Sequence, residues 1–429
     1  MTQRPPNIVF ILADDLGWGD LSCYGRPDYS TPHLDRLASE GARLTDCYAA
    51  SATCSPTRIA LFTGRYPARH PAGLPEPILP EWPGGEVGLE ASFPALPALL
   101  KERGYRTGLF GKWHCGPAPN YGPLKSGFEE YFGIDGAGAG YFNHVDQYGD
   151  PQLYEGDVPT RVNGYMTDLL TERACDFIAC HKQAPFYLSL HYTAPHWPWE
   201  APYDVDRAAT AVPHTNGGSI KTFGAMVQAL DAGVGRVMAA LAAQGLDHNT
   251  LVVFTSDNGG ERYSYQYPLT GHIRLLREGG IRVPGMARWP GVIPAGQVLG
   301  QPVITMDWSA TFLACAGTQA DPRFPPDGVP LLDLLAGRQA GFERTLFWRT
   351  MRMDAARCGP WKYWRNLDNG QEALFNLVHD IREYNNFKAS ESTRFNALKS
   401  TFLEWENTLL PRPAIQPLSK TEGLDFNFY

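Results

Sequence analysis

Short apolar runs that end in acidic or polar residues recur along the chain. Residues 7–12 form one such run, which ends at Ala13-Asp14-Asp15, and residues 251–254 form another, which ends at Thr255-Ser256-Asp257-Asn258. Residues 108–110 and 186–191 have a similar apolar character. A short apolar run of this kind is typical of a central strand in a parallel sheet, because such a strand is buried on both faces.

Helical stretches separate these predicted strands. They cover residues 32–40, 57–63, 96–103, 165–181 and 217–244. Strands that alternate with helices indicate an α/β fold, in which helices sandwich a large, mostly parallel sheet. Ligands of such sheets bind at the carboxyl ends of the strands, where the acidic residues fall. The Pro/Gly-rich residues 71–88 are predicted to be a long loop, because strand and helix signals resume after them.

The pattern changes near residue 340. Residues 344–348 and 361–365 look like short strands joined by turns, and residues 391–409 have a helical pattern. We therefore predict a main α/β domain over residues 1–340 and a smaller C-terminal α+β subdomain over residues 341–429 that closes one side of it.

Composition and charge limit the classes of partner. The 429 residues suffice for one large core and a second, smaller one, and 43% hydrophobic with 19% charged residues is typical of a soluble globular protein. A formal net charge of −8 argues against a nucleic-acid surface. No apolar run approaches the roughly 18 residues of a membrane span. We expect neither nucleic acid nor membrane as a partner.

The N-terminal residues contain no signal-peptide core, and the chain has no Asn-x-Ser/Thr sequon. We therefore expect a cytoplasmic protein, or a periplasmic or secreted one if a targeting segment has been removed. The eight cysteines are scattered without a C-x-x-C pair, which predicts neither a disulfide framework nor a zinc site. Most should be small buried hydrophobic residues. Cys54 is the exception.

Residues 54–65, Cys-Ser-Pro-Thr-Arg-Ile-Ala-Leu-Phe-Thr-Gly-Arg, are the most specific segment. A residue at a helix N-terminus lies near unpaired N–H groups that favour negative charge. Pro56 suits the first helical turn, and Arg58 lies one turn on, able to face the same point. The segment resembles the sulfatase signature, C-x-P-x-R followed by a helix and T-G-R. This resemblance implies that a dedicated maturing enzyme oxidises Cys54 to formylglycine, whose hydrated aldehyde is the nucleophile.

Four oxygen-bearing side chains follow the two predicted strands: Asp14, Asp15, Asp257 and Asn258. Either pair alone is as typical of a solvated turn or a helix cap, but together they offer the ligands that a hard cation requires. Both pairs match the sulfatase pattern, which implies that they share one divalent ion with residue 54. Calcium is the expected ion, with magnesium as the alternative, and it would polarise the sulfate oxygens.

Two further motifs supply basic side chains. Gly111-Lys112-Trp113-His114 follows a predicted strand and resembles the family's G-K-W-H; on an extended segment Lys112 and His114 project to the same side. Ala194-Pro195-His196-Trp197-Pro198 resembles A-P-H-x-P. The resemblance implies that Lys112 and Arg58 bind the sulfate charge, that His196 protonates the leaving alcohol, and that His114 takes a proton from the nucleophile. The other histidines that we considered, at positions 144, 191 and 272, match no motif.

One position departs from the family pattern. The family usually carries a lysine five residues before its Glu-Gly-Gly, and this chain has Ile273 at that distance from Glu278. Arg274 is the neighbouring candidate to bind the same sulfate oxygen, although arginine is a poorer proton donor because it stays charged. Further matches at residues 31–38, 104–107, 278–284 and 374–377 extend the resemblance across nearly the whole chain.

The resemblance implies a sulfatase-type α/β sandwich of the alkaline phosphatase superfamily, acting on sulfate esters of a carbohydrate or aryl substrate. Three alternatives stay open. The first is a phosphonate or phosphate monoester hydrolase of the same superfamily. The second is a zinc phosphatase with a Ser or Thr nucleophile, which the cysteine motif and the shortage of histidine ligands disfavour. The third is a binding protein without activity.

The sequence does not identify the substrate. Five aromatic residues flank the motifs and could either stack on sugar rings or anchor loops: Trp197, Trp199, Tyr263, Tyr265 and Tyr267.

Overall fold

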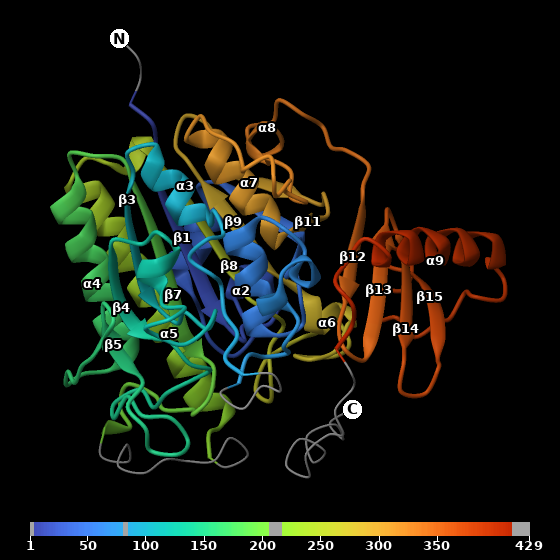
Figure 1. Cartoon of the computed structure of the whole chain (residues 1–429), viewed down its shortest axis with the longest axis horizontal. Helices are drawn as coiled ribbons and strands as arrows, with labels where there is room; N and C mark the ends of the chain where they lie inside the picture. The colour runs from blue at the N-terminus through green and yellow to red at the C-terminus, as the bar shows by residue number, and fades with distance from the viewer. Residues whose placement is uncertain (1–3, 80–84, 206–216, 414–429) are drawn as a thin grey trace.

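A computed structural model of the chain describes residues 4–79, 85–205 and 217–413 (Figure 1). Its main sheet contains eleven strands within these residues, in the order β10-β2-β9-β8-β1-β7-β3-β4-β5-β6, with β11 paired to β2. The strands are β1 (Asn7–Asp14), β2 (Ala42–Tyr48), β3 (Arg106–Gly111), β4 (Glu130–Ile134), β5 (Leu153–Glu155), β6 (Val158–Pro159), β7 (Phe186–Pro195), β8 (Thr250–Ser256), β9 (Arg282–Arg288), β10 (Gln297–Leu299) and β11 (Val303–Ile304).

The centre of the sheet is parallel, as predicted. β8, β1, β7, β3 and β4 run parallel to one another, whereas β9, β5 and β6 pair antiparallel with their neighbours. Every residue of β1, β7 and β8 is buried, because these strands are covered on both faces. Their parallel pairing brings their carboxyl ends to one edge of the sheet.

Alternate residues of β1 face two separate cores. Ile8 and Phe10 pack in one core with α2 (Cys54–Thr63), α3 (Leu96–Glu102) and α7 (Thr305–Cys315). Val9 and Ile11 pack in the other core with α1 (Pro32–Ser39), α4 (Met166–His181) and α5 (Ile220–Ala243). All five predicted helices are present, and α2 begins three residues earlier than predicted, at Cys54 itself.

One described helix, α5, is long and apolar enough to cross a membrane by length and composition alone. Its Phe223, Val227, Leu230 and Val234 are buried in the second core. A core helix with these apolar contacts meets the same criterion.

The C-terminal part forms a second sheet, β12-β13-β14-β15, which is antiparallel (Figure 1). Its strands are β12 (Thr345–Arg349), β13 (Met353–Cys358), β14 (Trp361–Asn366) and β15 (Glu372–Asn376), and α9 (Ser392–Glu406) covers one face. β12 and β14 match the predicted strands. β13 and β15 were not predicted; both contain alanine, which has weak strand propensity. Residues 414–429 of the predicted subdomain lie outside the described residues.

A buried ionic cluster joins the two sheets. Lys362 Nζ on β14 lies 2.8 Å from Glu278 Oε1 on α6 (Glu278–Ile281) and 2.9 Å from Glu383 Oε1. All three side chains are buried. Buried charges require such partners, so the cluster contributes to holding the C-terminal sheet against α6, next to the apolar core that Ile281 forms with Trp348 and Trp364.

The predicted loop 71–88 begins with a short 3-10 turn, Pro71–Gly73. Residues 80–84 of it lie outside the described part of the chain. Two side-chain contacts hold its described half: the backbone N–H of Ile78 donates to Ser55 Oγ at 2.6 Å, and the carboxylate of Glu76 accepts from the N–H of Met351 at 3.0 Å.

Candidate active site

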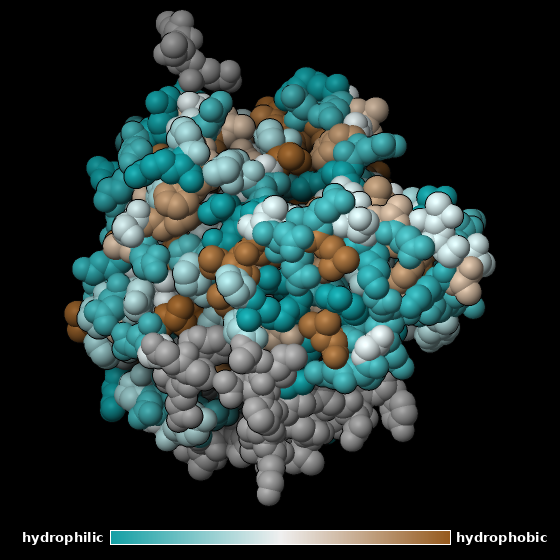
Figure 2. All heavy atoms as spheres, turned by 45° about the vertical axis from the view of Figure 1, so that its right-hand side comes forward, coloured by the Kyte–Doolittle hydropathy of each residue, from teal (hydrophilic) through white to brown (hydrophobic). Residues whose placement is uncertain are grey.

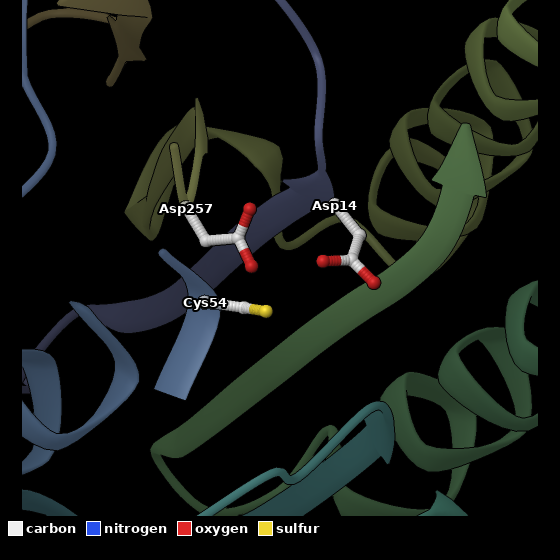
Figure 3. Close-up of side chains that lie close together, drawn as sticks. All are labelled: Asp14, Cys54 and Asp257. Carbon is white, nitrogen blue, oxygen red and sulfur yellow. The ribbon is translucent and has the colours of Figure 1, made fainter. Parts of the chain in front are cut away.

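The predicted acidic residues meet at the carboxyl edge of the sheet. Asp14 ends β1 and Asp257 follows β8, and the two strands pair in parallel with Ala13 opposite Ser256. Figure 3 shows the side chains of Asp14, Asp257 and Cys54 pointing into one space. One potential ligand atom from each lies within 4.8 Å of the others, and all three residues are buried. Neighbouring parallel strands therefore bring together residues that are far apart in the sequence.

Asp15 and Asn258 complete the cluster. Asp15 has a left-handed backbone with φ 61°, and its Oδ1 accepts a hydrogen bond from Asn258 Nδ2 at 2.6 Å. Asp15 Oδ2 and Asn258 Oδ1 are buried and have no hydrogen-bond partner among the described residues. Buried oxygens without partners are costly, so these two atoms indicate that a ligand belongs between the two loops.

Cys54 is the first residue of α2, after the N-cap residue Thr53. Burial raises the pKa of the Cys54 thiol to about 12, against a smaller lowering by Lys112, and Asp14 and Asp257 raise it further. The thiol is therefore protonated near neutral pH. A neutral, buried thiol is a weak nucleophile.

Arg58 and Lys112 neutralise the carboxylates directly. Lys112 Nζ donates to Asp14 Oδ1 at 3.0 Å and to Oδ2 at 2.7 Å. Arg58 Nη2 donates to Asp257 Oδ2 at 2.8 Å and to Asp14 Oδ1 at 3.3 Å. Burial alone would lower the pKa of both basic groups, but the adjacent carboxylates outweigh it and raise both. The two side chains are completely buried and charged.

The segment after β3 is not extended, contrary to the prediction. β3 ends at Gly111, where a Cβ would collide with the carbonyl oxygen of His191, and His114 has φ 51°. His114 Nε2 lies 3.0 Å from the carbonyl oxygen of Ile78, so Nε2 carries the proton. His114 Nδ1 is buried and has no partner among the described atoms. Burial, and then Lys112, hold the pKa of His114 well below its usual value.

His196 lies just after β7 and faces the same cluster. Its Nδ1 is 2.5 Å from the carbonyl oxygen of Trp197, so Nδ1 is a donor. Its Nε2 lies 3.8 Å from Asp15 Oδ2. The ring therefore presents Nε2 to the acidic residues.

Arg274 lies in a turn next to the helix that carries Cys54. Its φ is 72°, and its backbone N–H donates to the carbonyl oxygen of Ala52 at 2.7 Å. The Ile273 N–H donates to the carbonyl oxygen of Gly260 at 3.1 Å. The Arg274 side chain is half-buried and makes no ion pair within residues 4–79, 85–205 and 217–413. The turn thus brings the backbone of Arg274 near Cys54 without a carboxylate partner for its guanidinium.

Two contributions were missed by sequence reasoning. His191 on β7 lies 3.1 Å from Arg58 Nη1 through Nδ1 and 2.8 Å from Ser189 Oγ through Nε2. Burial, and then Arg58, lower the pKa of His191 well below its usual value, so it is neutral. The only sequence signal was the polar pair Ser189 and His191 within an apolar strand. The second contribution, the carbonyl group of Ile78, has no sequence signal because every residue has one.

The flanking aromatic residues divide into two groups. Trp199 and Tyr263 pack edge to face at 4.8 Å, and Tyr263 donates to the carbonyl oxygen of Gly217, so they anchor loops. Trp197 is half-buried and lines a shallow pocket together with Asn143 and Glu200. Tyr267 is 58% exposed.

Known proteins are similar to this chain over most of its length. The family model described as Sulfatase matches residues 6–318. N-acetylgalactosamine-6-sulfatase of Mus musculus is 35% identical over 389 residues, which cover 84% of this chain and 72% of that protein. Arylsulfatase A of Bos taurus is 34% identical, with 82% of this chain and 72% of that protein covered.

Solved structures agree with these relatives. The crystal structure of Ps i-CgsB in complex with k-i-k-neocarrahexaose has a TM-score of 0.85 at 31% identity and covers 99% of this chain and 97% of that chain. Phosphonate monoester hydrolase of Agrobacterium radiobacter has a TM-score of 0.68 at 19% identity, a likeness that shows the fold alone. With a family match over most of its length and relatives more than 30% identical, the chain belongs to the sulfatase family, hydrolases of sulfate esters.

Proposed function

We propose that the protein hydrolyses sulfate esters of carbohydrates, using a formylglycine made from Cys54 and one divalent cation, calcium before magnesium. One observation carries the proposal. The Cys54 side chain points at Asp14 and Asp257, and both carboxylates already contact Arg58. A relative named for a sulfated sugar and a similar structure with a bound oligosaccharide support a carbohydrate substrate.

The chemistry of Cys54 favours modification over direct attack by sulfur. With a pKa of about 12, its thiol is almost wholly protonated at neutral pH. A formylglycine hydrate at this position supplies an oxygen nucleophile instead. The motif Cys54-x-Pro56-x-Arg58 is what the proposed maturing enzyme would recognise.

The donor set fits a hard divalent cation. Asp14, Asp15, Asp257 and Asn258 would hold it, and two of their oxygens are buried without a partner in the described chain. Burial, and then Asp14, raise the pKa of Asp257 to about 6, and a bound cation would favour its charged form. A cation bound there supplies polarisation of the sulfate oxygens.

With a divalent cation bound, the charge of the cluster favours an anionic ester. When ionised, the three carboxylates outnumber Arg58 and Lys112 by one charge, and a divalent cation reverses the net charge to one positive. A sulfate monoester carries one negative charge, whereas a phosphate monoester carries nearly two above a pKa of about 6. A phosphonate monoester is also a monoanion and is the second candidate.

The histidines would divide the proton transfers. His114 is held as the Nε2–H tautomer by the Ile78 carbonyl oxygen, so its Nδ1 can accept a proton from residue 54. His196 presents Nε2 to the cluster and, when protonated, would donate to the leaving alcohol. Arg58 and Lys112, with Arg274 as a further candidate, would stabilise the negative charge on the sulfate.

The proposal is tested with three aryl esters that share one leaving group: a sulfate, a phosphate and a phosphonate monoester. Protein made together with a formylglycine-generating enzyme should hydrolyse the sulfate fastest, and a panel of sulfated sugars should contain a better substrate still. Faster turnover of the phosphonate ester would transfer the assignment to the second candidate. Equal activity without maturation would exclude the formylglycine.

A further inference from the structure

Arg382 is a cation flanked by exposed aromatic rings. Its guanidinium carbon lies 4.8 Å from the ring centroid of Tyr267 and 6.0 Å from that of Tyr384. Tyr267 is 58% exposed and Tyr384 is 69% exposed. Arg382 makes no ion pair with any carboxylate in the described part of the chain.

The backbone of Arg382 is held firmly. Its carbonyl oxygen accepts a hydrogen bond from Thr270 Oγ1 at 2.8 Å. The next residue, Glu383, is buried; its Oε1 pairs with Lys362, and its Oε2 accepts from the Glu278 N–H at 2.8 Å. A cation presented by such a network loses little freedom when it binds a ligand.

Both halves of this feature are joined to the loop that runs from the Asp257-Asn258 pair to Arg274, Tyr267 as part of it and Arg382 through the hydrogen bond from Thr270. The loop of Tyr267 follows the Asp257-Asn258 pair and is held against it, because Gln266 Nε2 donates to the carbonyl oxygen of Gly260 at 3.0 Å. The same loop continues to Arg274, whose N–H is bound next to Cys54. Arg382 comes from the C-terminal subdomain, and Figure 1 shows α6 between that subdomain and the main body.

We infer that Arg382, with Tyr267 and Tyr384 on either side, forms an accessory subsite for an anionic group on the sugar next to the one that carries the hydrolysed sulfate. This inference rests on the proposed function. A guanidinium binds a carboxylate or a sulfate through two parallel hydrogen bonds. Exposed tyrosines offer apolar ring faces with a polar edge, which suit a sugar. Figure 2 shows small, separate hydrophobic patches on the face of the molecule that carries the C-terminal subdomain.

The alternative is a purely structural role, a clasp, in which the cation–π contacts of Arg382 only stabilise the packing of the Tyr267 loop against the C-terminal subdomain. The two roles differ in their consequences. A clasp affects the melting temperature and every substrate alike, whereas a subsite affects only substrates that carry the second anionic group.

The test compares four substrates in the mature, full-length enzyme: one sulfated monosaccharide, and the same sugar extended by a neutral sugar, a uronate or a second sulfated sugar. Arg382→Ala should lower kcat/KM for the two anionic extensions by about 10- to 100-fold more than for the monosaccharide, mainly through KM. Arg382→Lys should recover only part of this, because an ammonium group lacks the planar fork. The uronate and sulfate arms show which anion is preferred.

Arg394→Ala is the matched control, because the Arg394 guanidinium on α9 likewise lies over an aromatic ring, 4.8 Å from that of Trp361, but has no contact with the loop of Tyr267 among the described residues. It should leave the ratios between substrates unchanged. An equal loss on all four substrates in Arg382→Ala, or no preference of the wild type for anionic extensions, would overturn the subsite. If the wild type hydrolyses none of the four substrates, the proposed function fails, and calorimetric titration with an anionic disaccharide then tests the subsite by itself. Weaker binding to Arg382→Ala than to the wild type would support the subsite. Equal affinity of the two proteins would exclude the subsite.

Discussion

Lys112 and Asp14 form an ion pair in which both side chains are completely buried, with Nζ 2.7 Å from Oδ2 and 3.0 Å from Oδ1. An ammonium group has three donors, and this pair uses two of them. One donor of Lys112 therefore remains for a ligand at the carboxyl edge of the sheet. The same lysine can neutralise Asp14 and contact a sulfate oxygen.

Conversion of Cys54 should be detectable in active protein. We expect mass spectrometry of the peptide that contains Cys54 to show formylglycine when a maturing enzyme is present. Cys54→Ala should abolish turnover while leaving the melting temperature within a few degrees, because the change removes one small buried side chain. Fully active enzyme with only the unmodified thiol would refute the mechanism.

Calcium should stabilise the folded protein through the acidic cluster. After chelation, added calcium should raise the melting temperature, and at a concentration 100 times Kd the gain is about 2.7 kcal/mol. Asp257→Ala should remove most of this gain, because it deletes one ligand. Asp333→Ala, which changes an exposed carboxylate, should keep it. An undiminished calcium effect in Asp257→Ala would place the ion elsewhere.

His196 should matter most for poor leaving groups. An alkoxide needs a proton as the ester bond breaks, whereas an acidic phenol does not, so His196→Ala should lose roughly 10²- to 10⁴-fold on an alkyl sulfate and far less on an activated aryl sulfate. The measurement is kcat on both substrates. The same loss on both would assign the acid to another residue.

Arg274 should act as an anion anchor in place of the lysine that Ile273 displaces. Arg274→Ala should lower kcat/KM to a similar degree for sulfates with good and poor leaving groups, because anchoring the sulfate does not depend on the departing oxygen. Arg338→Ala, at an exposed surface pair, is the control. Full activity of Arg274→Ala would show that Arg58 and Lys112 suffice.

Lys362 should stabilise the joint between the two sheets. Lys362→Met removes the cation that pairs with Glu278 Oε1 and Glu383 Oε1, while Glu278 Oε2 keeps Arg282, and should lower the free energy of unfolding by about 3–5 kcal/mol at neutral pH. Lys388→Met removes a surface partner of Glu372 and should cost less than about 1 kcal/mol. Urea unfolding of both variants measures the difference.

The pH dependence of this effect has a defined sign. Burial alone would raise the pKa of Glu278. The nearby cations Lys362, Arg282 and Arg357 outweigh burial and lower this pKa from 4.5 to about 2. A depressed pKa contributes stability that is present above pH 4.5 and is lost as the pH falls towards 2. The gap between wild type and Lys362→Met should therefore narrow below pH 4.5, and a gap that widens there would contradict the assigned ion pairs.

Local patterns in the sequence were sufficient for much of the fold and for the identity of the site residues. Strands that are buried on both faces need continuous apolar residues, so the apolar runs at residues 7–12 and 251–254 predicted β1 and β8. The acidic residues that follow had to lie at the carboxyl edge of a parallel sheet. The motif at Cys54 was also readable locally, because it predicted a helix N-terminus and a helix does begin at that residue.

Only the tertiary structure decided which groups meet and which atoms face one another. The tautomer of His114 depends on the Ile78 carbonyl oxygen, and Arg58 Nη1 contacts Nδ1 of His191, which lies on a separate strand. Tyr267 and Arg382 are more than 100 residues apart and meet because the C-terminal sheet docks on α6. The physical reason is that hydrophobic periodicity records burial along one element, whereas these contacts depend on strand order and on turns whose backbone atoms carry no residue-specific signal.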